Sequence, residues 1–302
     1  LIIHFSYKFS MNRLELISLS VLTSILIFIA LLYFNLPSGH KSDYINPIST
    51  SSLSQGRCLK EGMSFAVYYG PINSTVIQEL NDFSWVIIDP TQINSSELEQ
   101  IKAVKIAYLD LGELANMSLG NATPPANVVI GYDQQWNQYI VNVSSPAWEN
   151  YIESQVVTVM DMGFQGVMFD DVDVVEQYPC TAQGVISVIN WTRTHYHQAI
   201  IGINRGFAII GNVSDMINFV LFEDYGTQVV SPGEISFTNA TCVVEETQVL
   251  KGYNLTILAL GYANYPGDIY WKTVKSLANS EGIPSFVSNW DLCVIWLQNI
   301  AD

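Results

Sequence analysis

The segment PAWENYIESQVVTVMDMGFQGVMFDDVD, residues 146–173, decides the fold. Pro146 suits the first turn of a helix. The predicted helix has one apolar face, formed by Trp148, Ile152, Val156 and Val159. GVMFDD, residues 166–171, follows as a short apolar run, and KIAYLDLGE, residues 105–113, is a similar run before the helix. Strand, helix and strand in this order predict one repeat of a parallel α/β fold.

The same alternation continues along the chain. Eight apolar runs predict strands, namely FAVYYG (65–70), WVIIDP (85–90), KIAYLDLGE (105–113), GVMFDD (166–171), AIIGINRG (199–206), NFVLFED (218–224), LTILALGYA (255–263) and PSFVSN (284–289). Continuous apolar runs are typical of parallel strands that are buried on both faces. Eight units, each with helical sequence after the strand, predict a (β/α)8 TIM barrel. A doubly wound open sheet is the alternative, but no Gly-x-Gly-x-x-Gly turn follows the first strand.

A long apolar segment precedes this domain. Residues 14–36 carry few polar side chains and are long enough, as a helix, to cross a bilayer. Lys8 and Arg13 lie just before the segment, which favours an inside N-terminus and an outside C-terminal domain. We therefore expect a retained transmembrane helix, and a cleaved secretory signal is the alternative.

The remaining segments complete the predicted domain organisation. Residues 1–13 form a cytoplasmic stub, in which Met11 is a more natural start than Leu1. Residues 37–57 are rich in Ser, Pro and Gly, which is typical of a linker. The barrel domain then occupies residues 58–302.

Charge and sequons indicate where the domain acts. The 28 acidic residues outnumber the 12 basic ones, giving a net charge of −16, which disfavours nucleic acid and anionic lipid as partners. Nine Asn-x-Ser/Thr sequons all follow the apolar segment, at Asn73, Asn94, Asn116, Asn121, Asn142, Asn190, Asn212, Asn239 and Asn254. Together they predict a glycosylated, extracellular domain.

The four cysteines are not arranged as a Cys-x-x-Cys motif, so a zinc or redox site is disfavoured. In an exported domain we expect disulfides. A Cys58–Cys293 bridge would close the two ends of the domain, and Cys180 would then pair with Cys242. Four buried free thiols are the alternative.

Polar and aromatic residues follow the predicted strands, where the active site of such a barrel lies. We expect Asp170 and Glu223, which end the fourth and sixth strands, to be the catalytic pair. Further strand-end residues are predicted to bind substrate, namely Tyr68, Asp89, Glu113, Asp173, Asn204, Arg205 and Tyr262. A ring of carboxylates with aromatic and amide groups suits glycoside hydrolysis, in which one carboxyl protonates the leaving oxygen and another attacks or stabilises the sugar.

Several of these residues have simpler interpretations. The cluster of Asp170, Asp171 and Asp173 is also compatible with a metal-dependent hydrolase. Glu113 could form a structural ion pair with Arg205, and Asp89 could cap the turn that begins at Pro90. The preferred interpretation needs neither a metal nor an organic cofactor.

These motifs resemble glycoside hydrolase family 114. The resemblance rests on FAVYYG, WVIIDP, AYLDLGE, GFQGVMFDDVD, INRGF and VLFED, in this order, and covers about residues 62–290. It implies a (β/α)8 fold and retaining hydrolysis of α-1,4-linked galactosamine polymers by extracellular, endo-acting enzymes. The family's catalytic aspartate matches Asp170 and its glutamate matches Glu223, while Gly112-Glu113 and Asn204 to Phe207 match two further motifs.

The chain departs from the family pattern at two positions. Gly261 stands where the family commonly has Asp before Tyr-Ala, and Gln165 stands where it usually has Asp. An acidic residue at position 261 could have bound an amino group, so this departure bears on sugar specificity.

The sequence thus predicts a membrane-anchored glycosidase on the outer surface, or a secreted one if the N-terminal segment is cleaved. Its partner would be an amino-sugar polysaccharide, with Asp170 as nucleophile and Glu223 as general acid/base. The alternative is a non-catalytic barrel protein that binds glycan or a cell surface.

Overall fold

The computed structural model describes residues 63–114, 119 and 123–300. They form an eight-stranded parallel sheet with the order β1-β2-β3-β6-β7-β8-β11-β12. Its strands are β1 (Phe65–Tyr68), β2 (Trp85–Ile88), β3 (Val104–Asp110), β6 (Gly166–Asp170), β7 (Ile200–Asn204), β8 (Phe219–Phe222), β11 (Thr256–Tyr262) and β12 (Ser285–Ser288). The sheet curls into a nearly closed barrel, consistent with the predicted (β/α)8 fold, and all eight predicted strands are confirmed.

The two edge strands meet where the barrel closes. β1 and β12 are neighbours, and the Tyr69 N–H donates to the Leu292 carbonyl at 3.0 Å across the junction. The chain therefore brings the ends of its first and last strands to the same rim.

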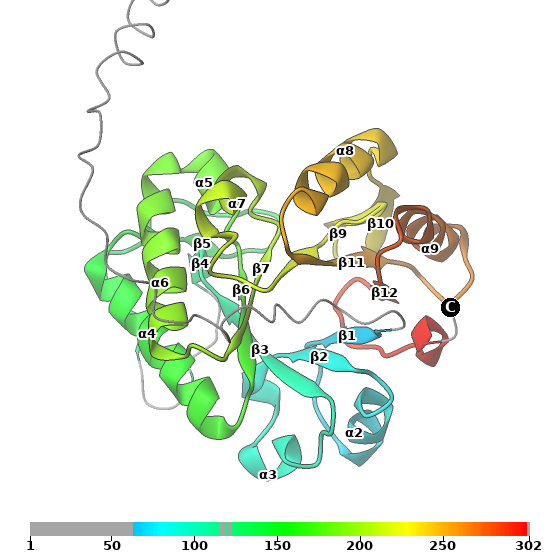
Figure 1. Cartoon of the computed structure of the whole chain (residues 1–302), viewed down its shortest axis with the longest axis horizontal. Coiled ribbons are helices and arrows are strands. Elements are labelled where there is room, and N and C mark those ends of the chain that lie inside the picture. Colours follow the sequence, from blue (N-terminus) through cyan, green and yellow to red (C-terminus); the bar gives the residue numbers. More distant parts are fainter. Residues whose placement is uncertain (1–62, 115–118, 120–122, 301–302) are drawn as a thin grey trace, which may run out of the picture. The chain divides into compact units, whose positions relative to one another are not determined.

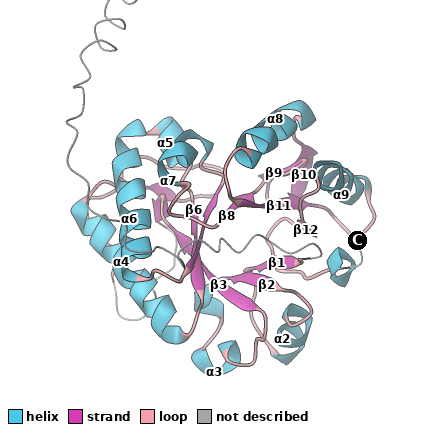
Figure 2. Cartoon of the chain, viewed as in Figure 1, coloured by secondary structure: helices cyan, strands magenta, loops and turns pink. Residues whose placement is uncertain are grey.

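Helices lie around the outside of the sheet (Figure 1, Figure 2). They are α2 (Ser74–Leu80), α3 (Ser95–Leu98), α4 (Pro146–Met162), α5 (Val174–Gln177), α6 (Ala182–His195), α7 (Ile210–Val213), α8 (Ala240–Lys251) and α9 (Ile269–Glu281). Short 3₁₀ turns are η1 (Pro90–Gln92), η2 (Pro179–Thr181), η3 (Phe207–Ile209) and η4 (Leu297–Ile300). In the eighth unit, a 3₁₀ turn follows the strand in place of the helical segment that the alternation predicts.

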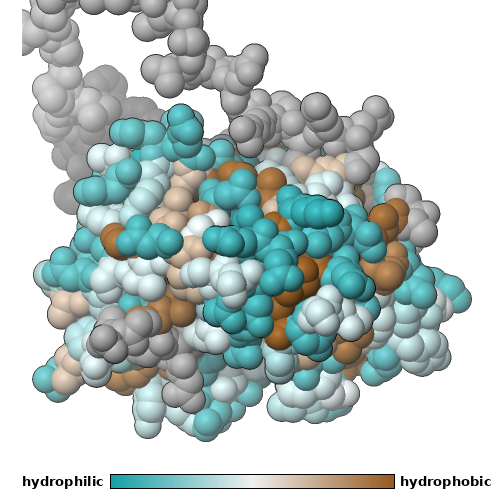
Figure 3. Space-filling model, turned by 90° about the horizontal axis from the view of Figure 1, so that it is seen from below, coloured by the Kyte–Doolittle hydropathy of each residue, from teal (hydrophilic) through white to brown (hydrophobic). Residues whose placement is uncertain are grey.

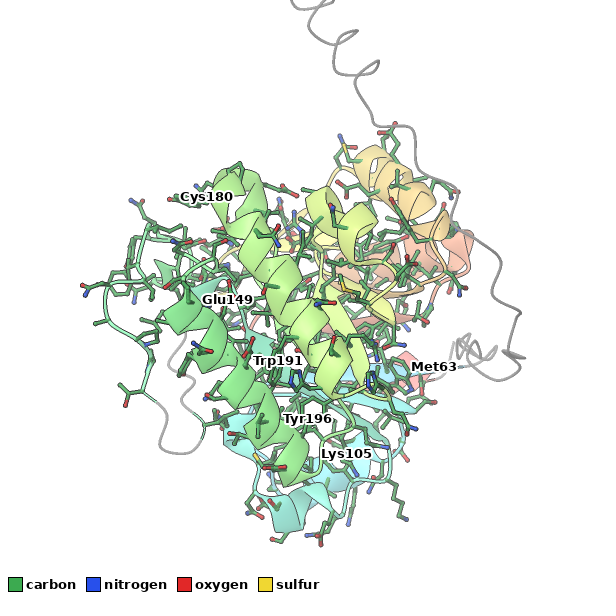
Figure 4. The ribbon with its side chains drawn as sticks, turned by 60° about the vertical axis from the view of Figure 1, so that its left-hand side comes forward. Met63, Lys105, Glu149, Cys180, Trp191 and Tyr196 are labelled. Carbon is green, nitrogen blue, oxygen red and sulfur yellow. The ribbon has the colours of Figure 1, made fainter. Side chains whose placement is uncertain are left out.

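The sequence defines the helix ends through caps. Asn73 accepts hydrogen bonds from the N–H groups at the start of α2, and Asn94 forms a capping box with Glu97 at the start of α3. α4 ends at Gly163, whose φ of 108° lies in the left-handed region that glycine adopts without steric cost. α4 and α6 lie side by side, and Ser187 of α6 donates to Glu149 of α4 at 3.1 Å (Figure 4).

Two antiparallel hairpins interrupt the α/β alternation. β4 (Glu113–Leu114) pairs with β5 (Tyr139–Ile140), and β9 (Thr227–Ser231) pairs with β10 (Glu234–Phe237). The sequence-based interpretation missed both. β4 and β5 are too short for a recognisable pattern, whereas Pro232-Gly233 is a turn signal that indicates the second hairpin.

Several predictions concern residues outside the described part. The cytoplasmic stub (1–13), the transmembrane helix (14–36), the linker (37–57) and Cys58 all lie there. In the part of the chain that the structure describes, no helix combines the length and apolar character needed to cross a membrane.

The predicted Cys180–Cys242 disulfide is wrong for this structure. Both thiols are free and exposed, and Cys180 lies just before α6 (Figure 4). Cys293 donates to the Asp291 carbonyl at 3.3 Å. The Cys58–Cys293 bridge stays a prediction, because Cys58 lies outside the described residues.

The sequons fall mainly on the surface. Of those the structure describes, Asn142 is half-buried and the others are exposed, namely Asn73, Asn94, Asn190, Asn212, Asn239 and Asn254. Asn73, Asn94 and Asn239 also cap helices, so these sequons have a structural role as well. Glycosylation stays a prediction. The face in Figure 3 shows mostly hydrophilic and neutral residues with small separate hydrophobic areas.

Gly202 tests the packing inside the barrel. A Cβ at Gly202 of β7 would lie 2.1 Å from the ring of the fully buried Phe219 on the neighbouring strand. We expect Gly202→Ala to lower the free energy of unfolding by about 1–3 kcal/mol through overpacking, measured by urea denaturation. Gly211→Ala on α7 is the control, because its nearest neighbour is 3.5 Å away. Equal stability of the two variants would contradict this packing.

Candidate active site

A cavity of about 510 Å³ lies at the carboxyl ends of the parallel strands. Most of the predicted site residues line it, namely Glu113, Asp170, Asp173, Asn204, Arg205, Glu223 and Tyr262. The barrel brings them together because parallel strands all end at one rim. Tyr68 and Asp89 do not line the cavity.

One amide group joins the two predicted catalytic carboxyls. Asn204 Nδ2 donates to Asp170 Oδ1 at 2.7 Å and also to Glu223 Oε2. Two oxygens that accept from one nitrogen lie within about 6 Å of each other, because each hydrogen bond is about 3 Å long. Asp170 and Glu223 therefore face the same small space from two different strands.

Further donors hold each carboxyl in place. The Asp171 N–H donates to Asp170 Oδ1 at 2.8 Å, and the Tyr262 hydroxyl donates to Glu223 Oε1. Burial raises the pKa of the Tyr262 phenol well above its usual range, so this hydroxyl stays protonated and available as a donor. Both carboxyls are thus fixed by hydrogen bonds from residues of the strand ends.

Burial makes both carboxyls weak acids. The pKa of Asp170 is raised, first by loss of water and then by the charge of Glu223. The pKa of Glu223 is also raised by burial and by Asp224, although the bonds from Tyr262 and Asn204 oppose the shift. Near neutral pH, one carboxyl can hold a proton while the other is ionised, as general acid catalysis requires.

Three strands turn sharply at their carboxyl ends. Asp171 and Arg205 directly follow β6 and β7, Asp224 is the second residue after β8, and their φ angles are 53°, 56° and 61°. Left-handed backbone is uncommon for residues other than glycine and is concentrated at functional sites. This repeated turn ends each strand at the cavity.

Arg205 is held by acidic residues of neighbouring loops. Its guanidinium lies 3.2 Å from Asp224 and 3.6 Å from Asp173. The alternative that Glu113 pairs with Arg205 is therefore wrong. Glu113 instead lines the cavity, and burial followed by the charge of Asp133 raises its pKa to about 7.

The structure replaces two predicted residues by neighbours. Tyr68 is buried and donates to the Pro71 carbonyl at 3.0 Å, whereas Tyr69 lines the cavity and its ring lies 4.5 Å from that of Tyr108. Asp89 accepts from the Thr91 N–H at 2.8 Å and caps η1, in agreement with the simpler interpretation. Sequence alone does not predict which of Tyr68 and Tyr69 lines the cavity, because β1 is buried throughout and its side chains do not alternate in polarity.

Two tryptophans at the cavity were not predicted to bind substrate. Trp136 lies between the two strands of the β4–β5 hairpin and is 42% exposed, and Trp290 follows β12. Beside Trp136, Gln135 Nε2 donates to the Val229 carbonyl of β9 at 2.8 Å, so the two hairpins meet at the cavity. Exposed aromatic faces of this kind can stack on sugar rings.

The three clustered aspartates have separate partners. Asp170 binds Asn204, Asp173 faces Arg205, and Asp171 contacts Asp110. Among the described residues, no group of three or more metal-ligating side chains converges. This arrangement does not favour the metal-dependent alternative.

The two departures from the family pattern lie away from the cavity. A Cβ at Gly261 would lie 2.4 Å from Val274 of α9, so a side chain here would meet the helix layer. Gln165 precedes β6 at the opposite end of the barrel and accepts from the Lys105 N–H at 3.1 Å. Neither position reaches the candidate site.

A nearly closed barrel with paired, half-buried carboxyls at the carboxyl ends of its strands has the architecture of a glycoside hydrolase. The chain belongs to glycoside-hydrolase family GH114, whose family model matches residues 48–294. No curated protein matches the chain.

Solved structures share this fold. The glycoside hydrolase domain of PelA from Pseudomonas aeruginosa is 19% identical, with a TM-score of 0.65 over 77% of this chain and 96% of that one. Aspergillus fumigatus Ega3, solved in complex with galactosamine, is 17% identical, with a TM-score of 0.61 over 80% of this chain and 96% of that one. The α-galactosidase TtGalA from Thermus thermophilus is 10% identical, with a TM-score of 0.51 over 80% and 62%.

The raised carboxyl pKa values predict how stability depends on pH. Asp110, Glu113, Asp170, Glu223 and Asp224 all have pKa values above their usual range, chiefly through burial. Between about pH 4 and pH 8 the folded chain therefore holds more protons than the unfolded chain, and stability falls as the pH rises.

We expect the melting temperature to decrease from pH 5 to pH 8 in thermal unfolding. The decrease should persist in high salt, which screens surface charge but not buried groups. A melting temperature that rises over this range would contradict the protonated carboxyls.

Proposed function

We propose that the protein is a retaining glycosidase that cleaves an α-1,4-linked galactosamine-type polysaccharide, with endo action, through Asp170 and Glu223. The observation that carries the proposal is the Asn204 amide, which binds both carboxyls. Retaining glycosidases hold their two carboxyls about 5–5.5 Å apart, whereas inverting enzymes need about 6.5–9.5 Å to admit a water molecule. The shared nitrogen favours the shorter separation.

Each carboxyl has one role in this proposal. Asp170 attacks the anomeric carbon, and the N–H of Asp171 and the Asn204 amide stabilise its ionised form. Glu223 protonates the leaving oxygen and then takes a proton from the water that releases the sugar. The raised pKa of Glu223 allows it to hold that first proton near neutral pH.

The charge of the cavity supports an amino-sugar substrate. Carboxyls line it on several sides, including Glu113, Asp133, Asp173 and Glu176, and Arg205 is the only Lys, Arg or His among the described lining residues. A protonated amino group would enter such a field favourably. The family and the galactosamine complex of the similar Ega3 structure support the same class of substrate.

The rival function, a non-catalytic glycan-binding protein, predicts a blocked cavity or catalytic carboxyls locked in ion pairs. The described residues contain no salt bridge to Asp170 or Glu223, and the cavity is present. These observations favour the enzyme.

The proposed location is outside the cell. The exposed sequons support it, and residues 14–36 would hold the protein at the membrane unless they are cleaved.

Reducing-sugar release from α-1,4-linked polygalactosamine tests the proposal. We expect Asp170→Asn and Glu223→Gln each to lower kcat by about 10²–10⁴-fold, because each removes an acid, base or nucleophile from the reaction. Asp161→Asn and Glu245→Gln make the same chemical changes on exposed positions of α4 and α8 and should leave the rate unchanged. Wild-type activity in a folded Asp170→Asn variant would refute the assignment.

A further inference from the structure

A second pair of carboxyls, Asp110 and Asp171, lies beside the proposed nucleophile Asp170. Asp110 ends β3 and stands opposite Asp170 in the sheet register. It is 6% exposed, its Oδ1 accepts from the Glu113 N–H at 2.9 Å, and its Oδ2 is buried without a donor. A buried carboxylate oxygen without a partner is costly, so this atom needs an explanation.

The group that faces Asp110 is the carboxyl of Asp171. Two ionised carboxylates are acceptors only, and neither can donate to the other. Asp171 is half-buried and lines the cavity, whereas Asp110 Oδ2 is buried, so two adjacent negative charges here would be only partly screened and would repel each other. A single proton between the carboxyls removes both problems, because one group then donates and the other accepts.

The backbone couples this pair to Asp170. Asp171 has a φ of 53°, and its N–H donates to Asp170 Oδ1 at 2.8 Å. The Leu111 N–H binds the Asp170 carbonyl at 3.1 Å. A Cβ at Gly112 would lie 2.1 Å from the Asp171 carbonyl oxygen, so the β3 loop packs directly against this turn. A movement of the Asp171 side chain would therefore shift the N–H that orients Asp170.

We propose that Asp110 and Asp171 share one proton, with the Asp171 carboxyl donating to Asp110 Oδ2, and that this pair is a positioning device for Asp170. Asp171 lines the cavity, but in this proposal it acts through Asp170 and not through a contact with the substrate. It fixes the left-handed turn after β6 and so presents the Asp171 N–H to Asp170. The functional part rests on the proposed role of Asp170, whereas the shared proton does not.

The surroundings of the pair keep the proton in place. Asp170, Glu113, Tyr69 and Tyr108 are the described titratable groups that face it, and none of them supplies a positive charge. Burial, ahead of these charges, raises the pKa of Asp110 to about 8 and that of Asp171 well above its usual range. The pair therefore keeps its proton at neutral pH and loses it in alkaline solution, when repulsion would displace the turn.

Two substitutions at position 171 separate the shared bond from mere space filling. Asp171→Asn supplies a permanent amide donor to Asp110, and asparagine tolerates the left-handed backbone. Asp171→Gly removes the donor without adding backbone strain. At pH 6 we expect the kcat of Asp171→Asn to exceed that of Asp171→Gly by at least about tenfold with little difference in KM, because Asp170 loses its orientation only in the glycine variant. Equal kcat values in the two variants would overturn the positioning role.

Carboxyl ¹³C NMR with labelled aspartate measures the protonation state of the pair and does not depend on enzymatic activity. In an Asp170→Asn/Glu223→Gln background, which lacks the catalytic carboxyls, we expect an aspartate signal that titrates only in alkaline solution. The signal should vanish when Asp171→Asn is added, which distinguishes it from Asp224. If all aspartates are ionised at pH 6 in that background, the shared proton is refuted, even if Asp171→Gly does not fold. A titrating pair in a protein that cleaves no galactosamine polymer would refute the proposed function and leave the shared proton intact.

Discussion

The site depends on one amide nitrogen that two half-buried carboxyls share. Asn204 ends β7, between the strands that carry Asp170 and Glu223, and its Nδ2 binds both. Its Oδ1 is buried and has no hydrogen-bond donor, so the orientation of the side chain satisfies the two carboxyls but leaves the amide oxygen without a partner. Strand order, the sharp turns after β6, β7 and β8 and the hydroxyl of Tyr262 all act to hold this arrangement.

This arrangement costs stability. Carboxyls that are buried beside one another raise each other's pKa, and only Arg205 offsets their charge among the described residues of the cavity. Natural active sites commonly retain such unfavourable groups because the reaction needs them. A cationic substrate would relieve the repulsion on binding, so the same charges that destabilise the free protein favour a polymer of amino sugars.

Much of the fold and part of the site follow from the sequence. Parallel strands that are buried on both faces consist of continuous apolar runs, so the sequence identifies them. In a (β/α)8 barrel the carboxyl ends of all strands lie at one rim, which predicts that Asp170, Asn204 and Glu223 lie close together. Because β1 is buried along its whole length, its sequence does not show which of Tyr68 and Tyr69 faces the cavity. The two-residue strands of the β4–β5 hairpin are too short to show a periodic pattern of apolar residues, so the sequence does not predict that Trp136 lies at the cavity. Nothing in the sequence distinguishes Asp110 from other polar residues, and only the strand register shows that it stands opposite Asp170. The Cys180–Cys242 pairing failed because it rested on elimination alone, and the two exposed thiols are free on η2 and α8.

The anomeric form of the first product tests the central claim most directly. In this account Asp170 and Glu223 are close enough for a covalent glycosyl intermediate, so cleavage of an α-linked polymer proceeds with retention. ¹H NMR of the reaction, recorded before the products mutarotate, should show the α-anomer first. Initial release of the β-anomer would contradict the account, because inversion needs a water molecule between carboxyls that are farther apart than one shared amide allows.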